Sequence, residues 1–177
     1  PGAEPVSVDE ELMRVLPVVE ALACNGKALL SIDTCKPEVA LVALRAGANV
    51  VNDITGLRES TMRSVVRECG AGAIAMHMRG TPATMQDAPA YDDVVAEVLE
   101  YLRASLLACE RDGIAPEQIL LDPGIGFGKT CEHNLSLLAH LPELEQAGRP
   151  LALGVSRKSF LGNVIGSGAL TERLWPT

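Results

Sequence analysis

Aromatic residues are scarce in this 177-residue sequence, at 3% of the total. A core must therefore be built mainly from Leu, Val, Ile and Ala, which suits a parallel α/β sheet better than a β-sandwich. The sequence also has no basic cluster, and its net charge of -8 argues against a nucleic-acid partner. No apolar run approaches the ~18 residues of a membrane span, so we expect no membrane partner. Small molecules and other proteins remain.

Cysteine pairs are missing as well. The five cysteines are odd in number, widely scattered and without a C-x-x-C pair, so we expect reduced thiols. No signal peptide is recognisable, and we therefore expect a cytoplasmic protein. Because the first residue is Pro1 instead of Met, we interpret the chain as processed or as a piece of a longer protein.

Short apolar segments alternate with amphipathic ones along the chain. We predict five strands, at residues 28–34, 50–55, 73–78, 118–122 and 151–156. Helices are predicted around them, at residues 9–25, 37–45, 59–69, 91–111 and 132–146. The strands show no clean alternation of polar and apolar residues. This pattern predicts a parallel sheet covered on both faces, in a single domain of residues 1–177.

Polar residues close each predicted strand. They are Asp33, then Asn52 and Asp53, then His77, then Asp122, and finally Ser156, Arg157 and Lys158. Such groups would spread along the edge of an open sheet but meet at one mouth in a (β/α)8 barrel, and five of them favour the barrel. A barrel typically needs ~250 residues and eight units. We therefore predict an incomplete barrel of about five strands.

A glycine-rich loop follows the fourth strand, in the sequence LDPGIGFGK that ends at Lys129. A P-loop would require glycine at position 123, where this sequence has proline, and a dinucleotide-binding fingerprint would require glycine at position 129. The carboxylate of Asp122 is the better indication of function. The Pro- and Gly-bearing segment 79–89 is too long for a plain connection, which makes it a candidate lid.

Six short motifs together resemble the dihydropteroate synthase family. They occur in order and at the right separations: PGAEP at 1, SIDT at 31, VVNDI at 50, MHMRGTP at 76, LDPGIGFGK at 121 and SRKSFLG at 156. The resemblance implies a transferase of folate biosynthesis that is the target of sulfonamides. Members join para-aminobenzoate to 6-hydroxymethyl-7,8-dihydropterin diphosphate and release 7,8-dihydropteroate and diphosphate.

The resemblance also assigns roles to residues. Asp122 would accept two hydrogen bonds from the amino group and ring N–H of the pterin, as a carboxylate can. Asn52 and Lys158 would bind the same ring, and Asp33 would stabilise positive charge as diphosphate leaves. We therefore assign catalytic roles to Asp33 and Lys158. The predicted pterin site consists of Asp33, Asn52, Ile54, Met76, Asp122, Phe127, Gly154 and Lys158, and the para-aminobenzoate or sulfonamide site of Pro1, Phe127, Ser156, Arg157 and Lys158.

Several of these residues also have structural explanations. Asp33 could cap the helix that starts near Pro37. Asp53 is more typical of a structural hydrogen bond than of catalysis, and His77 of a structural histidine. Gly154 could serve only close packing.

The family's remaining ligands fall on segments that this sequence does not contain. They include an Asn-bearing loop for Mg2+ and a terminal arginine and histidine. Mg2+ is therefore expected as the cofactor by resemblance, with no metal site within this chain. We expect a homodimer at full length and no activity from these 177 residues alone. Two alternatives stay open: a methyltetrahydrofolate-type methyltransferase domain, and a non-catalytic pterin-binding fragment.

Overall fold

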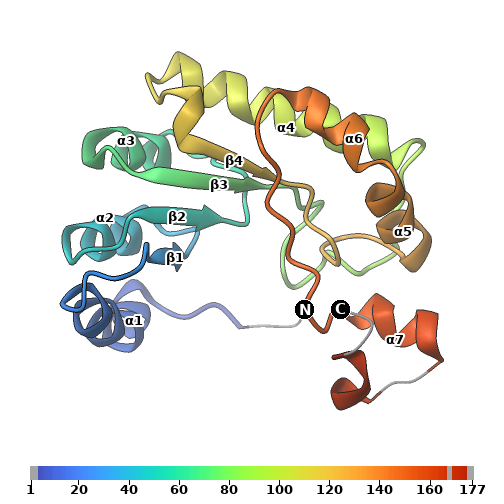
Figure 1. The fold of residues 1–177 in the computed structure, drawn as a ribbon, viewed down its shortest axis with the longest axis horizontal. Helices are drawn as coiled ribbons and strands as arrows, with labels where there is room; N and C mark the ends of the chain where they lie inside the picture. Colours follow the sequence, from blue (N-terminus) through green and yellow to red (C-terminus); the bar gives the residue numbers. More distant parts are fainter. Residues whose placement is uncertain (1–3, 167–168, 175–177) are drawn as a thin grey trace.

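A four-stranded parallel sheet forms the centre of the protein, as seen in a computed structural model that describes residues 4–166 and 169–174 (Figure 1). The strands lie in the order β1-β2-β3-β4, so that each pairs with its neighbour in the sequence. Their bounds are Ser31–Asp33, Val50–Asp53, Gly72–Met76 and Ile119–Asp122. Sequential parallel pairing is the arrangement of a barrel wall, because each crossover helix returns the chain to the same end of the sheet.

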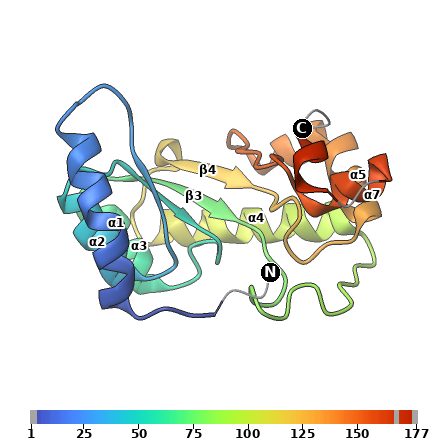
Figure 2. The same ribbon diagram turned by 90° about the horizontal axis from the view of Figure 1, so that it is seen from below.

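The helices connect and cover these strands. Figure 1 shows α1, α2 and α3 stacked along one end of the strands, from β1 to β3, and Figure 2 shows α4 running along β3 and β4. The α-helices are α1 Val8–Ala23, α2 Pro37–Arg45, α3 Ser60–Cys69, α4 Val94–Arg111, α5 Cys131–Ala139, α6 Leu141–Leu144 and α7 Ser159–Ile165. Three short 3-10 helices complete the described chain: Pro116–Gln118, Glu145–Ala147 and Leu170–Arg173.

Side-chain hydrogen bonds fix the starts of three of these helices. The Ser7 hydroxyl accepts from the backbone N–H of the third residue of α1, and Thr130 does the same at α5. Asp93 caps α4 by accepting from two backbone N–H groups. These residues satisfy donors that have no partner inside a helix. The predicted α4 start at Tyr91 was three residues early, because the cap lies at Asp93.

Burial alternates along the strands, and this corrects the expectation of a sheet covered on both faces. One set of side chains lies under the helices and is buried: Ile32, Val51, Asp53, Ala73, Ala75, Ile119 and Leu121. Most of the opposite set is half-buried or exposed. The helices of the described residues pack against one face only, as they do on the outside of a barrel wall.

The predicted fifth strand is much shorter than expected. Leu151 forms a single parallel bridge with Leu121, in which Leu121 N–H donates to Pro150 and Ala152 N–H donates to Leu121. The next bond of a parallel ladder would need an N–H at position 123, where proline has none. The ladder therefore ends after one bridge.

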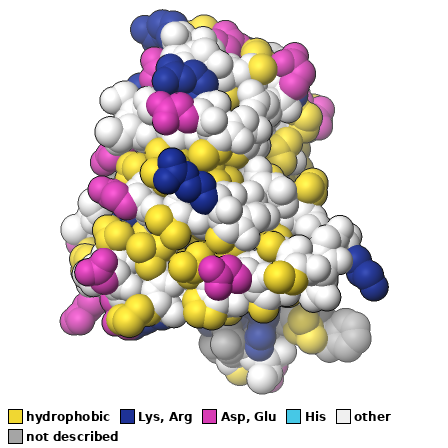
Figure 3. All heavy atoms as spheres, turned by 90° about the vertical axis from the view of Figure 1, so that its left-hand side faces the viewer, with side chains coloured by type: hydrophobic (Ala, Val, Ile, Leu, Met, Phe, Trp, Pro, Cys, Tyr) yellow, Lys and Arg dark blue, Asp and Glu magenta, His cyan; other side chains and the backbone are white. Residues whose placement is uncertain are grey.

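The predicted helix over 132–146 is also interrupted. It divides into α5, α6 and the 3-10 turn Glu145–Ala147, with the break at His140. Pro142 lies in the first turn of α6, where its missing N–H costs nothing, whereas inside a continuous helix it would remove a hydrogen bond. The surface over α1, α2 and α3 carries acidic and basic side chains scattered among hydrophobic ones (Figure 3).

Candidate active site

The polar residues predicted from the sequence meet at the carboxyl ends of the strands. Asp33 pairs in register with Asn52 on the neighbouring strand, and Met76 pairs with Asp122. All four belong to the set of side chains that faces away from the helices, because alternate residues of a strand share a face. Asn52 is in register with Ile74, so Met76 and Asp122 stand two residues closer to the mouth. The predicted convergence of these strand ends is therefore confirmed.

Asp33 and Asn52 form the first polar pair of the site. Burial raises the pKa of the Asp33 carboxyl, a hydrogen bond from the Asn52 side chain opposes the shift, and Asp53 and Glu11 add to it. The side-chain oxygen of Asn52 is buried without a hydrogen-bond partner among the described residues. A buried acceptor without a partner is costly, which marks this position as a place for a ligand donor.

Asp122 presents a second carboxylate at the end of β4, at the other edge of the described sheet from Asp33. Its Oδ1 accepts a hydrogen bond from the backbone N–H of Gly124 at 2.7 Å. Burial raises the pKa of Asp122, while the Gly124 bond and the charges of Lys158 and Lys129 lower it. Oδ2 keeps its capacity to accept hydrogen bonds. One oxygen of the carboxylate is therefore held by the loop, and the other can accept from a ligand.

Lys158 lies between these groups. Its Nζ stands 4.1 Å from the centre of the Phe127 ring, within the range of a cation–π contact. Burial lowers the pKa of Lys158, and the negative charges of Asp122 and Asp33 raise it in opposition. The Lys158 stem passes so close to Gly126 that a Cβ there would come within 2.9 Å of it. Glycine at 126 suits both this approach and the local backbone, because its φ of 82° is one that other residues rarely adopt.

An apolar wall borders the polar groups. Met76, Met78 and Met85 are buried together, and Ile54 and Phe127 pack against them. Carboxylates, an amide and an ammonium beside such a wall can bind a flat heterocycle with donors along one edge. Met78 and Met85 were missed from the sequence. Their signal was a methionine-rich run, MHM, followed by another methionine seven residues later.

The segment after Leu151 is less enclosed. Gly154, Ser156 and Arg157 are exposed, and a Cβ at Gly154 would meet no atom within 4 Å, so close packing does not explain this glycine. Arg157 adopts a positive φ of 55°, which turns the chain into α7. The predicted contact residue Pro1 lies outside the described residues.

The structural explanations have mixed outcomes. Asp33 does not cap α2, whose cap position is Lys36 with no side-chain bond. Asp53 is structural as expected: it is buried and accepts from the N–H and hydroxyl of Thr55 and the N–H of Leu57. His77 is likewise buried, and its ring lies edge-on to the ring of Tyr101, which agrees with a structural role.

The candidate lid lies on the glycine loop, defined as residues 123–130. The Gln86 amide donates to the Gly126 carbonyl at 3.0 Å, and the Tyr91 hydroxyl donates to Gly128 at 2.8 Å. Arg79, whose side chain is 54% exposed, forms an ion pair with Glu97 at 3.1 Å. Residues 79–91, called the strap below, thus fasten the glycine loop from outside.

Sequence reasoning missed two polar residues near the site. Lys129 is buried beneath the glycine loop, although it was read only as the end of a failed P-loop motif. Glu11 of α1 bonds the hydroxyl of Thr34 at 2.5 Å and the ammonium of Lys36, next to Asp33. The signal at Lys129 was a lysine in a loop otherwise made of glycine and apolar residues.

A metal site built from protein side chains needs several ligating groups close together. Among residues 4–166 and 169–174, no three His, Cys, Asp or Glu side chains gather closely enough to hold a metal ion. All five cysteines are free, with Cys109 buried. In the same part of the chain, none of the helices combines the length and apolar character that crossing a membrane would require.

Known proteins resemble this chain over its whole length. The profile of the pterin binding enzyme family matches residues 1–177. The dihydropteroate synthase of Escherichia coli strain K12 is 49% identical over 174 residues, which cover 98% of this chain and 61% of the relative. A Yersinia pestis dihydropteroate synthase solved with a sulfonamide drug has a TM-score of 0.95 at 42% identity, over 99% of this chain and 64% of its own.

A second solved relative, from Xanthomonas albilineans, was crystallised with 7,8-dihydropteroate. Its TM-score is 0.88 at 42% identity, over 97% of this chain and 63% of its own. The chain thus spans about three fifths of the length of the curated relatives it matches. These likenesses, with the sequential parallel sheet, show that the described fold is an α/β incomplete (β/α)8 barrel.

Proposed function

This chain belongs to the pterin-binding enzyme family, and we propose that the protein containing it is a dihydropteroate synthase. It would condense para-aminobenzoate with 6-hydroxymethyl-7,8-dihydropterin diphosphate, giving 7,8-dihydropteroate and diphosphate. The observation that carries the proposal is the meeting of Asp33, Asn52, Asp122 and Lys158 on one face of the parallel sheet, beside an apolar wall. The names of the relatives support it.

The pterin would lie along the strand ends. Asp122 would accept from the amino group and ring N–H of the pterin, and the unpaired oxygen of Asn52 would accept a further donor. Lys158 would donate to ring heteroatoms. Met76, Ile54 and Phe127 would line the ring with apolar surface, because these side chains form one apolar cluster there. Gly154 would leave room for the ring edge.

Asp33 would act where charge develops. The amine of para-aminobenzoate attacks the methylene carbon of the pterin, a C–N bond forms, the C–O bond to diphosphate breaks, and one amine proton is lost. If bond breaking runs ahead, the carbon becomes positive, and a fixed carboxylate nearby stabilises it. The Asp33 carboxylate needs no proton for this role.

The second substrate would enter beside α7. Ser156 and Arg157 would receive the carboxylate of para-aminobenzoate, and Phe127 and Lys158 would line its ring together with Pro1. Exposure of Ser156 and Arg157 leaves their side chains reachable from solvent. Sulfonamides would occupy the same place, and the Yersinia pestis relative was solved with such a drug.

Further properties of the whole protein are proposals of the same kind. We propose that residues 1–177 form one pterin-binding domain, and that the complete protein is a cytoplasmic homodimer that binds neither nucleic acid nor membranes. Mg2+ would be bound with the diphosphate by residues other than these, since the described side chains offer it no site. No step above passes through the metal.

A second candidate function is binding of pterin without turnover. It applies to these 177 residues taken alone, which span about three fifths of the length of the curated relatives. The curated relatives carry the name dihydropteroate synthase, so we do not retain the methyltransferase alternative.

One experiment separates turnover from binding. The 177-residue chain and the complete gene product that carries it are each supplied with both substrates and Mg2+, and dihydropteroate is followed by chromatography. Pterin binding is measured in parallel by titration calorimetry. We expect binding by both proteins and turnover only by the complete product. Steady turnover by the short chain would contradict its expected inactivity, and no pterin binding by either would overturn the proposed function.

A further inference from the structure

A buried lysine ammonium lies under the glycine loop with every donor satisfied. Lys129 is 3% exposed, and its Nζ stands 2.9 Å from His77 Nδ1, 3.0 Å from the Gly124 carbonyl and 2.9 Å from the Phe127 carbonyl. An ammonium has three N–H donors, and here each has one acceptor. Burying a charge is expensive unless it is bonded in this way, so the arrangement holds the cation in one place.

The two carbonyls come from the two ends of one tight turn. The N–H of Phe127 also donates to the Gly124 carbonyl at 3.0 Å, so the turn closes around the ammonium. Gly124 in turn donates to Asp122, and the Phe127 ring lies under the ammonium of Lys158. The position of Lys129 therefore reaches both the carboxylate and the wall of the predicted pterin site.

His77 holds the ammonium from below. Its ring packs edge-on against Tyr101 at 4.7 Å between centroids, and Tyr91 lies 6.1 Å away. Burial and the charge of Lys129 lower the pKa of His77 to about 3, so the imidazole is neutral and Nδ1 can accept. The His77 carbonyl also lies so close to Gly124 that no Cβ would fit there.

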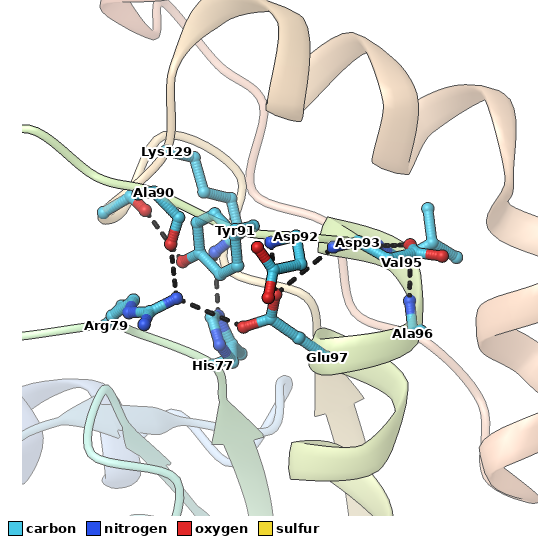
Figure 4. A network of polar contacts seen from close by, with 11 residues as sticks. His77, Arg79, Ala90, Tyr91, Asp92, Asp93, Val95, Ala96, Glu97 and Lys129 are labelled. Carbon is cyan, nitrogen blue, oxygen red and sulfur yellow. Dashed lines mark hydrogen bonds and ion pairs between the residues drawn. The ribbon is translucent and has the colours of Figure 1, made fainter.

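The strap closes this assembly from outside, as Figure 4 shows. The Arg79 guanidinium bonds the Ala90 carbonyl and Glu97, and Glu97 also accepts from the backbone of Asp92. The hydroxyl of Tyr91, the residue after Ala90, donates to the carbonyl of Gly128, the residue before Lys129. Water is thereby kept from the ammonium, which strengthens its bonds.

We propose that Lys129 is a positioning residue for the pterin: its ammonium, supported by His77, fixes Gly124 and Phe127 and so sets the shape of the pterin site. This inference rests on the proposed function for the identity of the ligand. Because Lys129 is almost fully buried, it would act through these groups and not by direct contact with the substrate. Its removal should weaken pterin binding beyond what a loss of stability explains.

The test compares the buried cation of Lys129 with the partly buried cation of Arg63 in the complete gene product. Lys129→Met keeps the length of the side chain and removes the charge. Arg63→Met is the matched control, because Arg63 also donates to two backbone carbonyls, of Leu57 and Arg58, and pairs with Asp112 at 2.6 Å, but touches none of the predicted site residues. Calorimetry with 6-hydroxymethylpterin gives Kd, and thermal unfolding gives Tm.

Tm reports any change in the stability of either variant, and we expect only Lys129→Met to raise Kd, by about tenfold or more, which corresponds to one lost charged hydrogen bond in the site. Equal Kd values for the two variants would overturn the proposal. If Lys129→Met does not fold, His77 supplies the second pair. His77→Asn can offer an acceptor in place of Nδ1 and should preserve Kd, whereas His77→Leu should raise it severalfold. An unchanged Kd in His77→Leu would also overturn the proposal.

Failure of the proposed function can be distinguished. If the unsubstituted protein does not bind the pterin, the ligand is wrong, and the positioning role is judged by amide hydrogen exchange. The Phe127 amide should then exchange at least about tenfold faster in Lys129→Met, with the amide of Leu121 in β4 unchanged. Unchanged exchange at Phe127 would overturn the positioning role whatever the ligand.

Discussion

The glycine loop and the segment 152–158 both border the predicted pterin site, but they are held in different ways. In the glycine loop, the Gly126 N–H bonds the buried Asn134 side chain at 2.7 Å, and Lys129 bonds two carbonyls. In the segment 152–158, Gly154 has open space around it, and the hydrogen bond from Lys158 N–H to Val155 is long, at 3.5 Å.

The difference shows what a binding loop needs besides the right side chains. Backbone donors and acceptors away from water require partners, and the glycine loop finds them in Asn134, Lys129 and the strap. The segment 152–158 leaves the sheet after a single bridge and is mostly exposed, so its site residues are presented but not enclosed. The two segments meet at Asp122, which accepts a hydrogen bond from Gly124 of the glycine loop and is influenced by the charge of Lys158.

The largest effect is expected at Asp122, where both sides meet. Asp122→Asn keeps the bond from Gly124 but replaces one acceptor oxygen by a donor, so the pterin edge loses its partner. Since bonds to a charged group contribute roughly 1.5–3 kcal/mol each, pterin Kd should rise by about 100-fold or more. Titration calorimetry measures it, with Asp9→Asn, at the exposed start of α1, as the control.

The same substitution should raise stability at neutral pH. The pKa of Asp122 is raised in the folded protein, chiefly by burial, so the folded state binds the proton more tightly than the unfolded state. Stability then falls as pH rises through this window, and an amide avoids the cost. In urea unfolding, Asp122→Asn should be more stable than the natural protein at pH 7 but not at pH 4. A variant that binds weakly and is also less stable at pH 7 would contradict this.

Next in size is the effect of Asn134→Ala on the glycine loop. Asn134 accepts from Gly126 and donates to the Thr130 carbonyl, both at 2.7 Å, and it is 1% exposed. Its removal leaves a buried N–H unpaired, which should cost about 2 kcal/mol of unfolding free energy. Denaturant unfolding tests this against Leu135→Ala, an exposed neighbour on α5. Equal losses would mean that the loop is not held by Asn134.

A smaller effect is expected at Lys158, on the less enclosed side. Lys158→Met keeps the stem that passes Gly126 but removes the ammonium above Phe127. Pterin Kd should rise by roughly tenfold with little change in Tm, because a half-exposed charge contributes less than a buried one. Lys27→Met, at an exposed lysine, should change neither value. A large drop in Tm would show that Lys158 is structural.

A separate pH dependence is expected to originate at Lys129, on the enclosed side. Burial lowers its pKa from 10.5 to about 7, with Asp122 raising it and Lys158 lowering it further. The unfolded state therefore binds more protons between these values, so stability rises with pH from about 7 towards 10.5. The difference in unfolding free energy between the natural protein and Lys129→Met, measured across this pH range, isolates the contribution of Lys129. A difference that does not change with pH would contradict the prediction.

Much of the architecture could be predicted from the order of residues. The βα alternation was readable because glycine and proline separate the apolar segments, and the strand-end residues Asp33, Asn52 and Asp122 came from that reading. The fifth strand was overestimated, because apolar content does not reveal whether the neighbouring strand has an N–H to offer. Pro123 removes that N–H, and only the register of Leu151 against Leu121 shows it.

The sequence by itself determined the strand ends, the motifs and the glycines, since these depend on local backbone preference and on chemistry that a residue carries wherever it lies. Tertiary structure decided which face the polar residues share, the orphan oxygen of Asn52, and the burial of Lys129 between His77 and the glycine loop. Burial and hydrogen-bond satisfaction depend on residues distant in the chain. Lys129 and His77 are 52 positions apart, and no local pattern announces that they will meet.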